Sequence, residues 1–164
     1  DQTNKLKVEL WYESSGHYPQ SPDQAAVWKA QLERTGVIEV TLKGADWASY
    51  KVNRDAEIMP VYSYGWYPDY VDPDNYVFLY WATWIHHNYE NPEAVALYDE
   101  ARAATDPTER SQLYAQIDDM VVRDCPNVPL YQAGAFAVTS PKVDGVVLDI
   151  AQLWRIWLLY AVES

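Results

Sequence analysis

The sequence predicts an α/β fold, with helices flanking a largely parallel or mixed sheet. Residues 6–12 alternate between apolar and polar side chains, and residues 37–42 are rich in β-branched side chains, which is typical of strands. Segments with helical periodicity separate such strands, and this alternation favours a layered α/β arrangement. The chain has 164 residues, of which 49% are apolar. This is enough for one sizeable core, so we expect a single α/β lobe over residues 1–164.

The first half of the chain is predicted to contain two helices and a further strand. The pattern Ser-Pro-Asp-Gln at residues 21–24 is typical of a capping box that starts a helix, and Gly36 is expected to end it. Asp46 is predicted to cap a short helix that runs to about residue 54. The apolar and aromatic run over residues 58–65 is interpreted as the next strand.

The second half is predicted to be helical first and strand-rich later. We expect a short helix near residues 74–80. Asn91 and Asp106 each precede a proline and then an acid, the pattern of a capped helix start, and the two helices are expected to run to about residues 104 and 123. Three strand-like runs follow, at residues 128–131, 135–139 and 143–150.

The composition argues against several classes of function. A net charge of −12 argues against a nucleic-acid partner, because phosphate binding needs clustered Lys and Arg side chains. Cys125 is the only cysteine, so no internal disulfide can form. His86 and His87 are adjacent, so on an extended chain their side chains point to opposite faces, and there is neither a spaced metal motif nor a glycine-rich phosphate loop. We therefore expect no cofactor and no metal site.

One stretch, Trp-Tyr-Pro-Asp-Tyr-Val-Asp-Pro at residues 66–73, carries the strongest functional signal. It follows the predicted strand over residues 58–65, and ligands of α/β proteins collect outside the carboxyl ends of strands. Asp69 offers a negative charge there, and Trp66 and Tyr67 offer flat apolar walls. A surface turn, in which Asp and Pro serve the backbone and the aromatic rings pack beneath it, accounts for the same residues about equally well.

The pattern Trp-x-x-Asp-Tyr-x-Asp-Pro resembles the signature stretch of the oligopeptide/dipeptide-type extracellular solute-binding proteins, family 5, which serve ABC transporters. Other motifs follow in that family's order. Each is weak alone, whereas the ordered set is specific, and together they cover most of residues 6–145. These further motifs are residues 32–37, 46–50, 91–93, 106–114 (with the pattern D-x-x-x-R-x-x-x-Y) and 126–131.

The resemblance implies a set of ligand-binding residues. In peptide-binding relatives the acid that matches Asp69 receives the α-ammonium group of the ligand, and the backbone around the residues that match Trp66 and Tyr67 pairs with the ligand like an added strand. We add Tyr64 to this ligand-binding set because it lies in the same aromatic region. The remaining residues of the stretch are expected to shape the loop: Tyr70, Asp72 and Pro73.

The resemblance also implies a context. It suggests a periplasmic-binding-protein type II-like lobe, most of the C-terminal lobe of a two-lobed receptor located outside the cytoplasm, in the periplasm or as a cell-surface lipoprotein. The expected partners are a peptide ligand, the N-terminal lobe that this chain lacks, and an ABC transporter permease. Residues 146–164 are expected to return towards the missing lobe.

Three alternatives remain open on the sequence. An oligosaccharide ligand is almost as well supported as a peptide, because eight Trp and 14 Tyr suit stacking on sugar rings. A glycoside-processing enzyme would use Asp69 and Asp72 as its two carboxylates, although their closeness in one proline-bounded turn makes independent aim at one bond difficult. An interaction domain would use the aromatic side chains as a docking patch.

Overall fold

The computed structural model describes residues 4–149, 151 and 155–162. These residues form two compact units, each with buried apolar side chains of its own. The first unit runs to Gly65 and includes Thr83–His86, and the second comprises Trp66–Ala82 and the described residues from His87 onward. The expectation of a single lobe over residues 1–164 stays a prediction.

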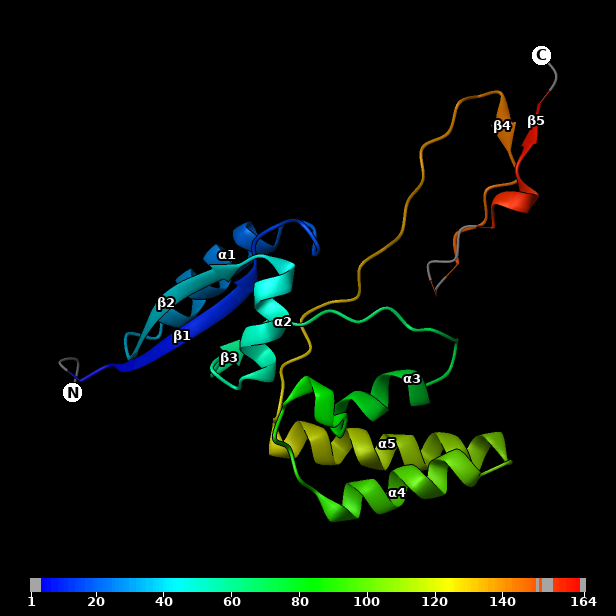
Figure 1. The fold of residues 1–164 in the computed structure, drawn as a ribbon. Helices are drawn as coiled ribbons and strands as arrows, with labels where there is room; N and C mark the ends of the chain where they lie inside the picture. Colours follow the sequence, from blue (N-terminus) through cyan, green and yellow to red (C-terminus); the bar gives the residue numbers. More distant parts are fainter. Residues whose placement is uncertain (1–3, 150, 152–154, 163–164) are drawn as a thin grey trace. The chain divides into compact units, whose positions relative to one another are not determined.

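The first unit is built on a parallel three-stranded sheet (Figure 1). β1 (Leu6–Glu13) lies in the centre and pairs with β2 (Ile38–Ala45) on one side and with β3 (Val61–Tyr62) on the other. Parallel neighbours need a crossover connection, and α1 (Ser21–Glu33) supplies it between β1 and β2. α2 (Trp47–Asp55) then connects β2 to β3. The predicted order of strands and helices in this part of the chain is confirmed.

The starts of the two helices show one confirmed and one wrong prediction. Asp46 caps α2, accepting hydrogen bonds from two backbone N–H groups of the first turn at 3.0 and 3.1 Å. The capping box predicted at residues 21–24 is wrong. Gln20 is the N-cap residue and makes no side-chain cap, whereas Ser21 lies inside α1 and is buried. The preceding loop sets the start of α1, because Gln20 adopts a left-handed backbone conformation, with φ 59°.

The third strand is much shorter than the predicted run over residues 58–65, of which only two residues pair with β1. The Ser63 backbone N–H still donates to the Trp11 carbonyl of β1 at 3.1 Å, but side-chain hydroxyl groups meet the carbonyl groups that follow. Tyr50 donates a hydrogen bond to the carbonyl oxygen of Ser63 at 2.5 Å, and Tyr18 donates to the carbonyl oxygen of Gly65 at 3.2 Å. Backbone acceptors satisfied in this way need no strand partner, and sequence periodicity does not reveal such an arrangement.

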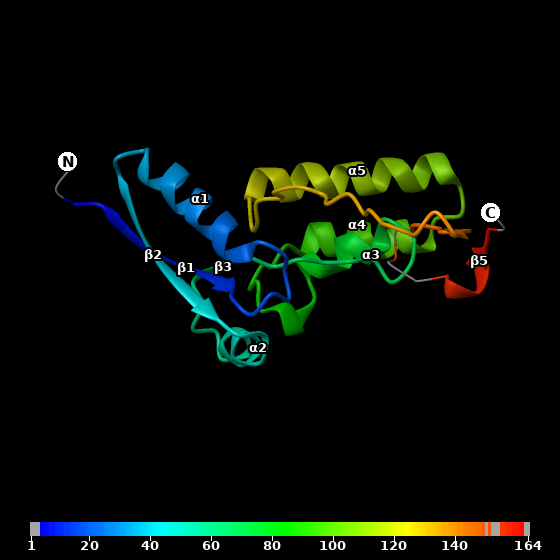
Figure 2. The same cartoon turned by 90° about the horizontal axis from the view of Figure 1, so that it is seen from above.

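The second unit consists mainly of helices. α3 (Asp74–Val77) passes directly into a 3-10 turn over Phe78–Tyr80, which confirms the short helix predicted near residues 74–80. α4 (Pro92–Ala103) and α5 (Pro107–Asp124) lie side by side in two views (Figure 1, Figure 2) and pack along their length.

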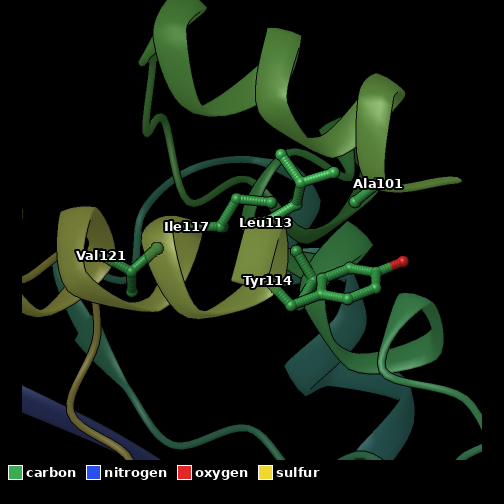
Figure 3. Close-up of a cluster of buried hydrophobic side chains, with 6 residues drawn as sticks. Ala101, Leu113, Tyr114, Ile117 and Val121 are labelled. Atoms are coloured by element: carbon green, nitrogen blue, oxygen red, sulfur yellow. The ribbon is translucent and has the colours of Figure 1, made fainter. Parts of the chain in front are cut away.

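The core of this unit lies between α5 and the helices that precede it (Figure 3). Both predicted caps are confirmed: Asn91 accepts a hydrogen bond from the first turn of α4 at 3.1 Å, and Asp106 accepts two from that of α5 at 2.9 Å. Apolar residues of α5 recur at helical spacing, which buries one face of the helix. The core residues are Val77, Ala101, Leu113, Tyr114, Ile117 and Val121.

The chain beyond α5 forms fewer strands than predicted. The strands expected at residues 128–131 and 135–139 are wrong, because these residues are irregular and pair with no strand in the part of the chain that the structure describes. Of the third expected strand only β4 (Val143–Asp144) forms, and it pairs in antiparallel fashion with β5 (Tyr160–Ala161). Residue 150, the expected end of that strand, lies outside the described residues.

Apolar side chains of this C-terminal segment (residues 126–149, 151 and 155–162) are largely exposed. Phe136 and Val138 are 86% and 91% exposed, and Trp157 is also exposed. A strand is stable only when its backbone groups find partners. The β-branched composition of the segment was therefore insufficient to make strands without a neighbouring edge.

The packing of α5 predicts that substitutions on its buried face lower the unfolding free energy much more than substitutions on its exposed face. Replacing the fully buried Ile117 by Ala should lower the unfolding free energy of the second unit by about 2–5 kcal/mol, because the substitution leaves a cavity. Replacing Val122, which is 77% exposed on the same helix, by Ala should change the unfolding free energy by less than about 0.5 kcal/mol. Urea unfolding followed through amide NMR signals of α4 and α5 measures both, and equal effects of the two substitutions would contradict the packing.

Candidate ligand-binding site

The stretch singled out in the sequence forms a loop that enters α3, here called the Asp69 loop (residues 66–75). Its centre is the side chain of Asn75, which is 2% exposed. The Asn75 Oδ1 accepts hydrogen bonds from the indole Nε1–H of Trp66 at 3.0 Å and from the backbone N–H of Asp69 at 2.8 Å. One buried amide therefore ties the predicted aromatic wall to the predicted acid.

The Asp69 loop divides its side chains between the interior and solvent. Pro68 is buried, and the Trp66 ring packs edge-to-face against Phe78, with ring centroids 5.7 Å apart. Tyr67 is 47% exposed, and Asp69 is exposed as well. The loop thus presents a carboxylate and an aromatic ring to solvent from a backbone that is anchored on both sides of them.

Asp72 is held by an arginine from α5. The guanidinium of Arg110 forms a bidentate pair with the Asp72 carboxylate, with N–O distances of 2.8 and 2.9 Å. The same guanidinium donates to the Ala101 carbonyl at 3.1 Å and to the Tyr114 hydroxyl at 3.0 Å. The hydrogen bonds from Arg110 lower the pKa of Asp72 below its ordinary value, although partial burial works in the opposite direction.

The neighbouring acid, Asp74, is also engaged. It accepts a hydrogen bond from the Tyr70 hydroxyl and forms an ion pair with Arg102 at 3.3 Å. Its backbone N–H donates to the Asp72 carboxylate at 2.8 Å, which closes the turn. These side chains line a shallow polar pocket of about 240 Å³ whose charges are paired with one another.

Asp69 differs from both neighbours in its charge environment. Its Oδ2 receives only a long contact from the Asn75 Nδ2, at 3.5 Å. Within residues 4–149, 151 and 155–162, no Lys, Arg or His side chain lies within ion-pair distance of Asp69. Of the three acids in the loop, Asp69 is therefore the one whose charge is not compensated by an arginine.

Tyr64, the fourth predicted ligand-binding residue, belongs to the first unit, whereas Trp66, Tyr67 and Asp69 belong to the second. Its hydroxyl accepts a hydrogen bond from Arg54 at 3.4 Å, and the same guanidinium lies 5.6 Å from the centre of the Tyr64 ring. Burial raises the pKa of the Tyr64 hydroxyl above its ordinary value. Tyr64 is thus held by the protein's own arginine.

Sequence reasoning missed the two residues that organise the loop. The sequence pattern gives Asn75 no role beyond that of a common turn residue after the Asp-Pro pair. Arg110 was noticed as part of a helical pattern, without its partner. Only the fold brings residues 72 and 110 together, 38 positions apart in the chain.

The described residues also bear on other kinds of function. No group of three His, Cys, Asp or Glu side chains in the described residues is arranged to hold a metal ion. Nor is any described helix both long and apolar enough to cross a membrane. The Asp72 carboxylate, with its lowered pKa and bidentate partner, is poorly suited to act as the protonated acid of a glycosidase pair.

Comparison with known proteins shows the family to which the chain belongs. Residues 1–87 match the family model of the bacterial extracellular solute-binding proteins, family 5, in its middle region. The chain belongs to this family. Solute-binding relatives match over most of the chain: the periplasmic oligopeptide-binding protein OppA of Haemophilus influenzae is 29% identical over 145 residues, which cover 87% of this chain and 26% of that protein. The heme-binding protein A of the same organism is 32% identical over 107 residues, which cover 62% of this chain and 20% of that protein.

Solved structures of family 5 proteins have the same fold. A dipeptide-binding protein from Pseudoalteromonas in complex with Met-Leu matches with a TM-score of 0.80 and 20% identity, over 97% of this chain and 33% of that one. Haemophilus influenzae OppA in complex with the peptide RPPGFSPFR matches with a TM-score of 0.76 and 25% identity, over 99% of this chain and 32% of that one. The predicted fold class, an α/β lobe of the periplasmic-binding-protein type II kind, is confirmed. This chain spans about a quarter of the length of the curated family 5 relatives.

The pairing of Asp72 with Arg110 predicts a pH dependence. Because the folded pKa of Asp72 lies below its unfolded value, about 3.9, the contribution of the pair to stability is complete above the unfolded value and is lost as the pH falls through the folded value. The advantage of the wild type over Asp72→Asn in unfolding free energy should therefore be constant between about pH 5 and 7 and shrink below about pH 4.

Urea unfolding at a series of pH values measures this difference. Asp99→Asn, at an exposed acid on α4, serves as the control for the loss of one negative charge. An advantage over Asp72→Asn that did not change down to pH 2 would contradict the role of the ion pair.

Proposed function

We propose that this chain is the ligand-capturing part of a solute-binding protein that takes up peptides for an ABC transporter. Asp69 receives the α-ammonium group of the peptide. The observation that carries this proposal is the contrast within one loop: Asp72 and Asp74 are paired with Arg110 and Arg102, and Asp69 has no such partner among the described residues. A carboxylate held in place with its charge uncompensated is suited to bind a cation from outside.

The backbone next to Asp69 supports the same function. Tyr67 makes no backbone hydrogen bond within the part of the chain that the structure describes. Its N–H and C=O groups are therefore available to an extended ligand, which would pair with them as an added strand. Main-chain pairing is indifferent to the side chains of a peptide, and together with one charge at the amino terminus it gives affinity for many sequences.

The names of the relatives support a peptide over a sugar. The Haemophilus influenzae and Salmonella typhimurium relatives are named oligopeptide-binding proteins, and one Pseudomonas aeruginosa relative is named a di/tripeptide-binding protein. Other relatives are named for heme and deoxycholate, so the ligand class needs a direct test. A stacking role for the Tyr67 ring would serve an oligosaccharide equally well.

The proposed function requires a second lobe and a transporter. A two-lobed receptor buries most of its ligand when it closes. The partners are thus an N-terminal lobe and a transporter permease, and the location is outside the cytoplasm. The exposed apolar side chains of the C-terminal segment support a covering lobe. In this proposal, residues 146–164 form the segment that leads back to that lobe. Of these, residues 150, 152–154 and 163–164 lie outside the described residues.

An NMR titration of this chain tests the ligand class. We expect tri-alanine to shift the amide signals of Tyr67 and Asp69 at millimolar concentration, because half of a closed site holds its ligand weakly. Malto- and manno-oligosaccharides should leave these signals unchanged. Shifts with the sugars alone would replace the peptide by an oligosaccharide, and silence with both series would contradict ligand capture by this chain.

Replacing Asp69 measures the ammonium contact. The carboxylate is exposed in this chain, so Asp69→Asn should weaken tri-alanine binding by at most about 1 kcal/mol, or about fivefold. In a complete receptor, where closure removes the pair from water, the loss should rise to about 2–5 kcal/mol. The control Asp99→Asn makes the same change of charge on α4 and should leave binding unchanged, and equal effects of the two would contradict a specific contact.

The exposed C-terminal segment predicts self-association. A chain with contiguous exposed apolar side chains associates in water, so the double variant Phe136→Ser, Val138→Ser should have a lower apparent mass in sedimentation than the wild type at equal concentration. Val122→Ser, at an exposed valine of α5, is the matched control and should behave like the wild type. A wild type that remains monomeric at millimolar concentration would remove the argument for a covering lobe.

A further inference from the structure

We propose that Asn75 is the positioning residue of the Asp69 loop, and that it sets the selectivity of the site for a charged amino terminus. The inference rests on the proposed function and adds a residue that neither the sequence pattern nor the resemblance assigned. Asn75 does not touch the ligand. It acts through Asp69 and Trp66, which it holds in one arrangement before a ligand arrives.

The first argument is the burial of the Asn75 amide. The side chain is 2% exposed, and its Oδ1 accepts two hydrogen bonds, at 2.8 and 3.0 Å, from groups on two other residues of the loop. Its backbone N–H is bonded as well, to the Asp72 carbonyl at 3.1 Å. Rotating the amide away would leave buried polar groups without partners, which is costly, so the amide is fixed.

The second argument is the direction of the bonds. The backbone N–H of Asp69 is bonded to Oδ1 of Asn75, so the position of the Asp69 main chain is set by the strong contact. The Nδ2 of the same amide lies 3.5 Å from Asp69 Oδ2, a long contact that leaves the charge of the carboxylate uncompensated. The other carboxylate oxygen has no hydrogen-bond partner among the described residues, and Asp69 as a whole is exposed.

The third argument is the coupling to the aromatic wall. The Trp66 Nε1–H shares the oxygen that anchors Asp69. A single side chain thus ties the Trp66 ring to the Asp69 main chain, which carries the carboxylate. A site whose groups are ordered in advance does not lose affinity by ordering them when the ligand binds. Without Asn75, the carboxylate would have to be ordered by the ammonium group itself.

The experiment compares tri-alanine with N-acetyl-tri-alanine, which lacks the charged amino terminus, by NMR titration of the 164-residue chain. The wild type should bind the free amine up to about fivefold more tightly than the acetylated peptide, the ratio expected for an exposed charge pair. Asn75→Ala should reduce this ratio to less than about twofold, because the affinity for the free amine falls more than the affinity for the acetylated peptide. A purely structural loss would lower both affinities together.

Two control variants separate positioning from general destabilisation. Asp99→Asn changes the charge of the same unit outside the Asp69 loop, at an exposed acid of α4, and should keep the ratio of the wild type. Asn91→Ala removes another amide of the same unit, the cap of α4, and should lower stability without changing the ratio. Asp69→Asn, in contrast, should abolish the ratio.

Hydrogen exchange of the wild type tests the inference even if the Asn75 variant fails to fold. The Asp69 amide proton and the Trp66 indole proton should both exchange with solvent more slowly than those of an unstructured peptide, because each is bonded to a buried oxygen. Unprotected exchange of both protons would overturn the inference.

The outcomes distinguish the inference from the function on which it rests. If Asn75→Ala keeps a ratio that Asp69→Asn loses, the positioning role is wrong and the proposed function stands. If the wild type itself binds both peptides equally, the ammonium contact is wrong, and the inference falls with it.

Discussion

The guanidinium of Arg110 is the group on which the local arrangement of the second unit depends. It bonds the Asp72 carboxylate in the Asp69 loop, the Ala101 carbonyl in α4 and the Tyr114 hydroxyl in its own helix. The guanidinium is planar and carries five N–H donors, so it can bond all of these acceptors at the same time. A lysine ammonium group does not offer this geometry. Because the pair is only 25–30% exposed, it is partly shielded from water and connects the loop to the helices beneath it.

Asp72 and Asp74 form ion pairs with arginines, whereas Asp69 forms none with the described residues, although the three acids look alike in the sequence. In a chain of net charge −12, an exposed carboxylate is common and its charge alone indicates nothing. What marks Asp69 is the combination of a backbone anchored by Asn75 and a charge with no cationic partner among the described residues. The bidentate partner and the lowered pKa of Asp72 also make it poorly suited to be the protonated acid of a catalytic pair with Asp69.

The predictions that succeeded depend on contacts within a few residues. Asp46, Asn91 and Asp106 cap their helices because a short acceptor side chain reaches N–H groups two or three positions ahead, whatever the rest of the fold does. Ser21 shows the limit of this reasoning: the chain before it takes a left-handed turn at Gln20, and the serine enters the helix as a buried residue. In the candidate site, the acid and the aromatic residues stand in one local pattern, and their roles stay predictions, whereas the contacts of Asn75 and Arg110 do not follow from that pattern.

The sequence by itself determined the α/β class, the order of the helices and the stretch that carries the candidate site, because periodicity, capping and the Trp-x-x-Asp-Tyr-x-Asp-Pro pattern are local properties. Only the tertiary structure decided where strands end and which acid is left uncompensated. The segments 58–65, 128–131 and 135–139 have strand-like composition, yet pairing depends on whether a neighbouring edge or a tyrosine hydroxyl meets their backbone. Charge compensation at Asp72 likewise depends on an arginine 38 residues away, and a contact over such a separation exists only after the chain has folded.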